Sequence, residues 1–127
     1  MSKTGIYGAY QLSLRRWKVV EVELKSGETT RHVYGHEVSH DVGRASSPIK
    51  SFDREAMLVT TQSGSHYRLQ GLPGTSTVAD KAWLHWCKNN NVIRELDVTH
   101  EYMDVSKVSI VGFEKLIRLS VKETGGQ

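Results

Sequence analysis

Residues 17–36 read WKVVEVELKSGETTRHVYGH, and this stretch decides the fold. Val and Leu at positions 20, 22 and 24 alternate with two glutamates, a period of two that predicts a strand with one buried face. Ser26-Gly27 follows as a turn, because glycine readily adopts the positive φ that a tight hairpin needs. β-Formers resume over residues 29–36, so we expect a first hairpin.

A second stretch repeats this pattern. The runs AMLVTT (56–61) and HYRLQGL (66–72) flank a turn built on Ser63-Gly64, which predicts a second hairpin. Between the hairpins, residues 39–54 contain glycine, proline and several Ser and Asp residues. They predict a long surface loop, with Ile49 and Phe52 as its apolar anchors.

One helix is expected after the second hairpin. Thr75, Ser76 or Thr77 can cap its N-terminus, and the helix would run to about Asn89. Three asparagines at 89–91 favour a stop, because Asn tolerates positive φ. The apolar stripe comprises Ala79, Ala82, Trp83 and Trp86.

The remaining segments are less regular. Residues 92–103 fit either an extended segment or a short helical turn. Residues 115–122 (KLIRLSVK) alternate apolar and polar side chains, which favours a last strand, with a helix as the alternative.

Together these elements predict an α+β fold. We expect a mainly antiparallel sheet of about five strands, formed by the two Ser-Gly hairpins and a C-terminal strand, with one Trp-rich helix packed on it. A length of 127 residues predicts a single domain over 1–127, and residues 1–5 and 123–127 are expected to be flexible tails. The edges of such an open sheet make a homodimer plausible.

Cysteine and apolar content bear on location. Cys87 is the only cysteine, which excludes an intramolecular disulfide and fits a reducing compartment. The sequence contains neither a long apolar run nor a secretory signal. We therefore expect a soluble, cytoplasmic protein without membrane association.

The sequence gives little support for an enzyme. His32, His36 and His40 could share a metal on a helix, but on a strand four residues span about 13 Å, so we expect no metal site. Cys87 falls near a helix end and neighbours Trp83 and Trp86, where a small buried hydrophobe is expected rather than a nucleophile. GxSxG, P-loop, GxGxxG and HExxH motifs are all missing, so we predict no catalytic residue and no cofactor.

The positive charge is unevenly distributed. The net charge is +3, and residues 1–50 carry eight Lys/Arg against five Asp/Glu, whereas the rest of the chain is balanced. Basic residues mixed with aromatic ones can bind nucleic acid or form hot spots in protein interfaces, although a solvated strand edge also carries such charges. The candidate binding residues are Arg15, Arg16, Trp17, Lys18, Tyr34, His66, Tyr67 and Arg68.

A resemblance adds context. The segment RHVYGHEVSHDVGRASSPIKSFDREAMLVTTQSGSHYRLQGLPG, followed by AWLHWCKNNNV and DVTHEYM, is similar to uncharacterised short proteins of the bacterial accessory genome. Integron gene cassettes, genomic islands and plasmids carry such proteins, and the similarity covers about residues 17–113. The resemblance implies a small adaptive or host-interaction protein of the bacterial cytoplasm, and it supplies no activity and no site residue.

Three functions therefore remain open. The first is a non-enzymatic binding protein that engages a macromolecule, protein or nucleic acid, through the basic-aromatic N-terminal region and the 39–54 loop. The second is a small-molecule binder or enzyme with a pocket between sheet and helix, using His66, Tyr67, Arg68 and His85. The third is an inhibitor of a host or phage protein.

Overall fold

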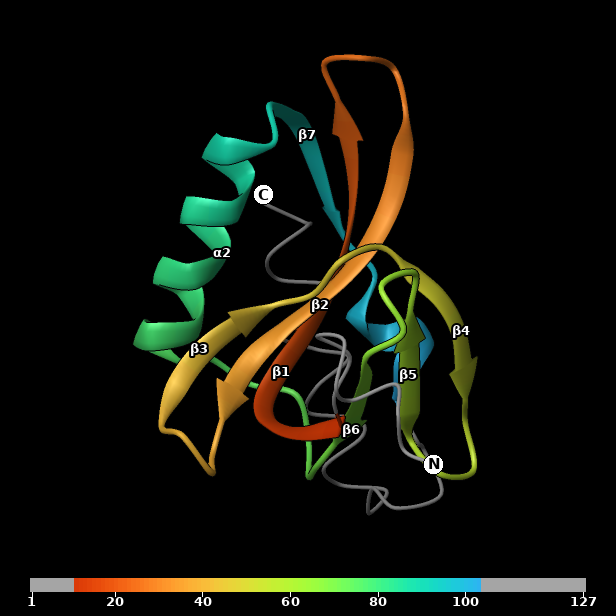
Figure 1. Cartoon of the computed structure of the whole chain (residues 1–127), viewed down its shortest axis with the longest axis vertical. Helices are drawn as coiled ribbons and strands as arrows, with labels where there is room; N and C mark the ends of the chain where they lie inside the picture. Colours follow the sequence, from red (N-terminus) through yellow and green to blue (C-terminus); the bar gives the residue numbers. More distant parts are fainter. Residues whose placement is uncertain (1–10, 104–127) are drawn as a thin grey trace, which may run out of the picture.

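The computed structural model describes residues 11–103 (Figure 1). The elements follow one another as β1 (Gln11–Leu24), β2 (Thr29–Glu37), β3 (Val42–Ala45), β4 (Ile49–Asp53), β5 (Leu58–Thr61), β6 (His66–Leu69), α2 (Thr77–Asn89), β7 (Val92–Asp97) and the short 3-10 helix η1 (Thr99–Tyr102). None of the helices among these residues is long and apolar enough to cross a membrane.

β1 organises the sheet. The strand order is β3-β2-β1-β6-β5-β4, and β7 also pairs with β1. β2 lies along one side of β1, whereas the other side pairs first with β6, over residues 11–14, and then with β7, over residues 20–24. The β1–β6 pair is parallel and all other pairs are antiparallel.

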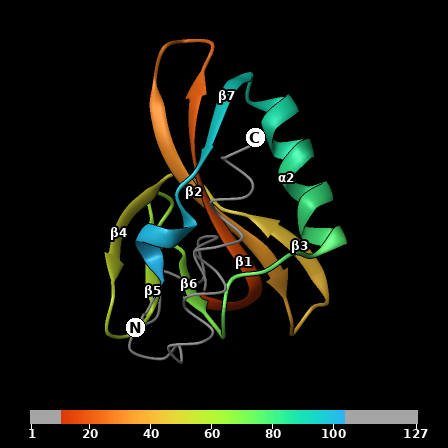
Figure 2. The same ribbon diagram turned by 180° about the vertical axis from the view of Figure 1, so that it is seen from behind.

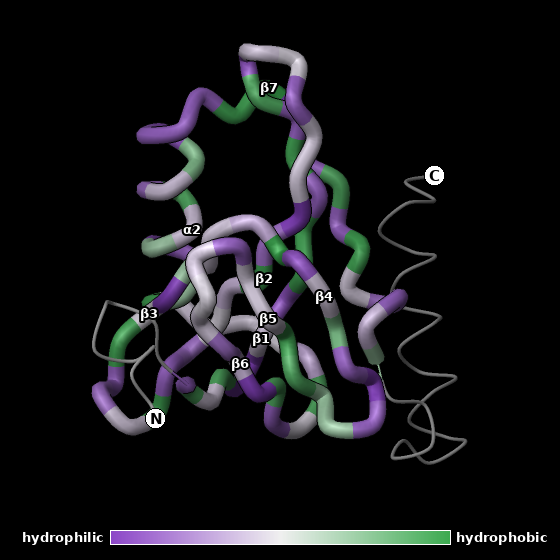
Figure 3. The backbone as a smooth tube through the Cα atoms, turned by 45° about the vertical axis from the view of Figure 1, so that its right-hand side comes forward, coloured by the Kyte–Doolittle hydropathy of each residue, from purple (hydrophilic) through white to green (hydrophobic). Residues whose placement is uncertain are grey.

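Two apolar clusters lie on the two faces of the β1–β2 hairpin. Helix α2 covers one face, and the β4–β5–β6 strands with η1 lie against the other (Figures 1 and 2). Consecutive residues of β1 serve both clusters, because side chains alternate along a strand: Val19 belongs to the first and Val20 to the second. The central part of β1 is therefore apolar on both faces, and hydrophobic and hydrophilic stretches follow one another along the tube of Figure 3.

The predicted fold class is confirmed in its main features. The chain is α+β, with one α-helix in the described residues and a mostly antiparallel sheet. Both Ser-Gly turns are present, with φ of 96° at Gly27 and 91° at Gly64. The expected number of about five strands is too low, since the sheet has seven strands within residues 11–103.

The extra strands come from segments expected to be irregular. Residues 39–54, predicted as a loop, contain β3 and β4, and Ile49 and Phe52 pack against the first cluster as predicted. Residues 92–103 form β7 and η1, so both alternatives for this segment occur in succession. The predicted strand at 115–122 and the predicted tails at 1–5 and 123–127 lie outside the described residues.

The helix begins and ends close to the predicted positions. The Ser76 hydroxyl caps it by accepting the Ala79 N–H at 3.3 Å, and Asn90 is its C-cap. Asn91 follows with φ of 55°, as expected for an Asn stop. Ala79 and Trp83 are buried against the sheet, and Trp86 is half-buried beside them.

Candidate functional site

Arg15 and Arg16 stand on a bulge of β1. The pairing of β1 with β2 shifts register between Arg15 and Lys18, and Arg16 has φ of 49°, which L-residues rarely adopt. Leu14 and Trp17, fully buried on either side, leave two residues between them where regular alternation allows one. Both arginines are consequently exposed.

The two guanidinium groups have few partners. Arg16 donates from Nη1 to the carbonyl of Thr75 at 3.3 Å, and Arg15 has no side-chain hydrogen bond or ion pair with any of residues 11–103. Arg31, by contrast, lies 2.9 Å from the Glu21 carboxylate and 2.8 Å from that of Glu101. Arg15 thus keeps its charge available to a ligand.

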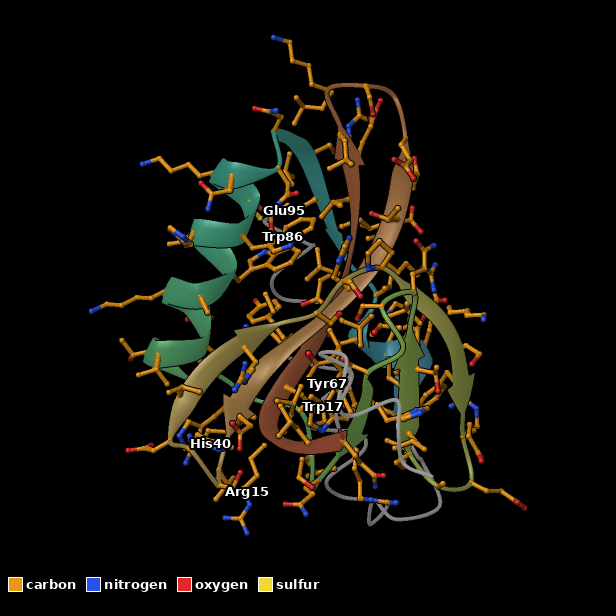
Figure 4. All side chains as sticks on the ribbon, in the orientation of Figure 1. Arg15, Trp17, His40, Tyr67, Trp86 and Glu95 are labelled. Carbon is orange, nitrogen blue, oxygen red and sulfur yellow. The ribbon has the colours of Figure 1, made fainter. Side chains whose placement is uncertain are left out.

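The β2–β3 turn lies at the same end of the sheet, because His36 is the cross-strand partner of Arg15. Figure 4 labels Arg15 and His40 at this end. The His36 Nε2 lies 2.7 Å from the Asp41 carboxylate. We call Arg15, Arg16, His36, His40 and Arg44 together the arginine end.

Glu37 holds this turn in place. It is fully buried, and its carboxylate lies 2.7 Å from His40 Nδ1 and 3.5 Å from Arg44 Nε. It also accepts hydrogen bonds from the Ser39 hydroxyl and from the His40 backbone N–H. Burial acts to raise the pKa of Glu37, but these hydrogen bonds outweigh it and lower the pKa to about 2. His40 is fixed through Nδ1, with its side chain 62% exposed.

The predicted aromatic residues are not exposed, and that part of the interpretation is wrong. The exposed fraction is 0% for Trp17, 7% for Tyr34 and 4% for Tyr67. Trp17 donates to the carbonyl of Gly71 at 3.1 Å, and Tyr34 stacks on Trp83 with ring centroids 5.0 Å apart. Strands buried on both faces take up large aromatics, so these rings cannot stack on the bases of a bound nucleic acid.

The other predicted residues lie apart from Arg15 and Arg16. Lys18 is half-buried opposite Tyr34. His66 Nδ1 contacts the Thr60 hydroxyl at 3.0 Å, and Arg68 Nη1 donates to the carbonyl of Ala56 at 3.0 Å. His66 and Arg68 are thus engaged within the β5–β6 region, whereas Arg15 and Arg16 are brought together at the bulge.

Among residues 11–103, neither the remaining histidines nor Cys87 belongs to a group arranged to bind a metal ion or to activate a nucleophile. Within residues 11–103, no group of three His, Cys, Asp or Glu side chains is arranged to hold a metal ion. His32 is fully buried, its Nδ1 lying 2.8 Å from the Ser46 carbonyl and its Nε2 2.7 Å from the Thr30 hydroxyl. Burial and the nearby Glu95 raise the pKa of the Cys87 thiol to about 11, so the thiol is protonated at neutral pH.

Aromatic side chains pack between helix α2 and the sheet, and a hollow of about 510 Å³ lies beside them where α2 is followed by β7, lined by Leu84, His85, Cys87, Lys88 and Val92. Trp83 stacks on both Tyr34 and Trp86, and its Nε1 donates to Glu95 at 2.8 Å. Figure 4 labels Trp86 and Glu95 beside helix α2. The His32 ring completes this packing 4.2 Å from Trp86. His85 is exposed on α2, away from His66, Tyr67 and Arg68, so the four groups proposed for a sheet–helix pocket do not converge.

Most residues of the arginine end could not be selected from the sequence. The sequence predicts His36 on a strand, whereas His40 and Arg44 fall in residues 39–54, which it predicts as a loop. The β2–β3 hairpin brings the three together, and hydrophobic periodicity does not reveal that pairing. One signal was present for the bulge itself. Two basic residues between Leu14 and Trp17 break the period of two by one residue.

Comparisons with known proteins identify no relative. The chain matches no protein-family model, and neither the curated proteins nor the solved structures contain a significant match. The resemblance to accessory-genome proteins therefore stays a prediction.

Proposed function

We propose that this protein is a non-enzymatic binding protein whose arginine end contacts an acidic macromolecular partner, nucleic acid or protein. The observation that carries the proposal is Arg15, exposed on a bulge and without a side-chain partner among residues 11–103. A strained backbone that presents a charged side chain is a frequent property of functional sites.

The chemistry of the arginine end favours oxyanions. Guanidinium groups bind phosphate and carboxylate through paired N–H donors, and two consecutive arginines can contact adjacent groups. Because the nearby aromatic rings are buried, binding depends on charge rather than on base stacking. We therefore expect affinity with little sequence preference and a strong dependence on salt.

Retention on heparin and on random-sequence DNA tests the proposal. Replacing Arg15 and Arg16 by Ala should lower the salt concentration for elution, and should reduce the slope of log affinity against log salt by about 2. The matched control replaces Lys25 and Lys88 by Ala, which removes the same charge from exposed positions on the β1–β2 turn and on α2. Equal elution of the two double variants would contradict the proposal.

A further inference from the structure

One sheet edge is left open where β3 turns away from β2. β3 pairs with β2 only over Tyr34–Glu37, and Ser46 makes the last contact, its N–H donating to the Val33 carbonyl at 2.9 Å. Pro48 follows and has no N–H with which to continue the ladder. Within residues 11–103, no strand pairs with this side of β2 over Thr29–His32.

The backbone groups on this edge can be assigned from the pairing alternation. Val33 directs both its N–H and its carbonyl away from β1, since they bond to the hydroxyl and the N–H of Ser46. In an antiparallel pair, alternate residues point the same way, so the backbone groups of Arg31 and Thr29 also face outward. The edge therefore offers the hydrogen-bonding groups of two residues to an added strand.

A groove lies beside this edge. Its volume is about 420 Å³, with β2 residues Thr29–Arg31 on one side, residues 48–52 on the other, and Tyr102 and Gln62 contributing further to its lining. Its lining includes the β2 residues whose outer edge is unpaired within residues 11–103. The unpaired edge covers Thr29–His32, and four residues of strand span about 13 Å, so an added segment would be short.

Other open edges of the sheet are protected. Pro48 precedes β4, and the pairing of β4 with β5 is interrupted around Lys50. β7 has an irregularity in its pairing with β1 and carries several charged residues, and α2 packs against β3. Bulges, prolines, charges and covering helices are the usual means of blocking an edge. The outer edge of β2 at Thr29 and Thr30 has no bulge, proline, charge or covering helix within the part of the chain that the structure describes. The charged Arg31 side chain is held by Glu21 and Glu101.

The charges of the groove select its occupant. Lys50 is exposed on the wall and makes no ion pair with residues 11–103, whereas Glu21 is already paired with Arg31. Arg31 is shared by Glu21 and Glu101, so the one charge of the groove lining without an ion-pair partner among residues 11–103 is that of Lys50. We propose that the outer edge of β2 binds a short extended peptide segment of a partner protein, which adds as a strand and places an acidic side chain against Lys50.

The test uses capped seven-residue peptides of alternating Thr and Val, with Asp or Lys at the centre. In the full chain labelled with ¹⁵N, the Asp peptide should shift the Thr29 and Arg31 amide signals and saturate, with at least fivefold higher affinity than the Lys peptide. Lys50→Glu should reverse that preference. Thr29→Pro removes an outward N–H and should weaken binding at least tenfold, whereas Thr29→Ala keeps it and should change affinity less than twofold.

Several outcomes would overturn the inference. The first is a lack of saturable shifts, and the second is equal peptide affinity in Thr29→Pro and Thr29→Ala. The third is a shift of the Thr29 and Arg31 signals that needs no peptide and grows with protein concentration, because the occupant would then be a second copy of the chain. Hydrogen exchange gives a check that does not depend on any variant. If the Arg31 amide in the free full chain is as protected as that of Val19, the edge is already occupied and the inference fails.

Discussion

His32 shows how a single buried polar residue can make stability depend on pH. Its imidazole packs at a tilt against Trp86, and both of its nitrogens have hydrogen-bond partners. Burial lowers the pKa of His32 below its ordinary value of 6.5, and the hydrogen bond to the Ser46 carbonyl offsets this only in part. The unfolded chain therefore takes up a proton at higher pH than the folded protein does. The contribution of neutral, buried His32 to the free energy of unfolding is therefore fully present above about pH 6.5 and is lost as the pH falls.

We accordingly expect the free energy of unfolding to decrease between about pH 7 and about pH 5. His32→Phe should reduce this decrease, at a cost of about 1–3 kcal/mol near pH 7, because the Ser46 carbonyl loses its donor. Urea unfolding followed by tryptophan fluorescence measures both effects. The control is His85→Gln on the exposed face of α2, which should leave the pH dependence unchanged. An unaltered slope in His32→Phe would show that another group is responsible.

At the scale of elements, the contact between β3 and α2 depends on a glycine. A Cβ at Gly43 would collide with the backbone carbonyl of Val78 in the first turn of the helix, and backbone cannot move aside as a flexible side chain can. Gly43→Ala should destabilise the protein by about 1–3 kcal/mol, measured as a shift in the urea midpoint. Gly74→Ala is the matched control, since its Cβ would meet Arg16 at an ordinary 3.6 Å and should cost less than about 0.5 kcal/mol. Similar midpoints for the two variants would contradict this account.

Elements with strong local signals could be predicted from the sequence. The two hairpins have glycine turns, and α2 has a capping serine, an apolar stripe and an asparagine stop. β3 and β7 carry little such signal: β3 is four residues long, and most side chains of β7 are exposed, so neither shows a hydrophobic period. β7 depends on pairing with β1, which is distant in the sequence, and β3 depends on a pairing with β2 through a turn that has no glycine signal of the Ser-Gly kind.

The candidate site was predictable only in part, for a related reason. Arg15 and Arg16 could be selected from charge alone. The exposure of Trp17 and Tyr34 could not be judged, because it depends on β1 and β2 being covered on both faces. A period of two in hydrophobicity indicates a strand that is covered on one face only. A strand that lies between two layers is apolar on both faces and does not show that period.

For the whole molecule, the shared strands should make unfolding a single event. β1 and β2 supply residues to both clusters, so neither cluster can open while the other stays intact. We expect the amide signals of Val59 in the first cluster and Ala79 in the second to disappear at the same urea concentration. Different midpoints for these two signals would show that α2 separates from the sheet independently.

The parallel pairing of β1 with β6 also has a consequence for how the protein is made. β1 is synthesised before all other described strands. Its second side cannot pair until much later residues have been made, since Leu14 pairs with Leu69 and Val20 with Asp97. Contacts between residues so far apart in the chain slow folding. During synthesis the apolar central strand stays half-complete, and in that interval the nascent protein is most exposed to aggregation and most dependent on chaperones.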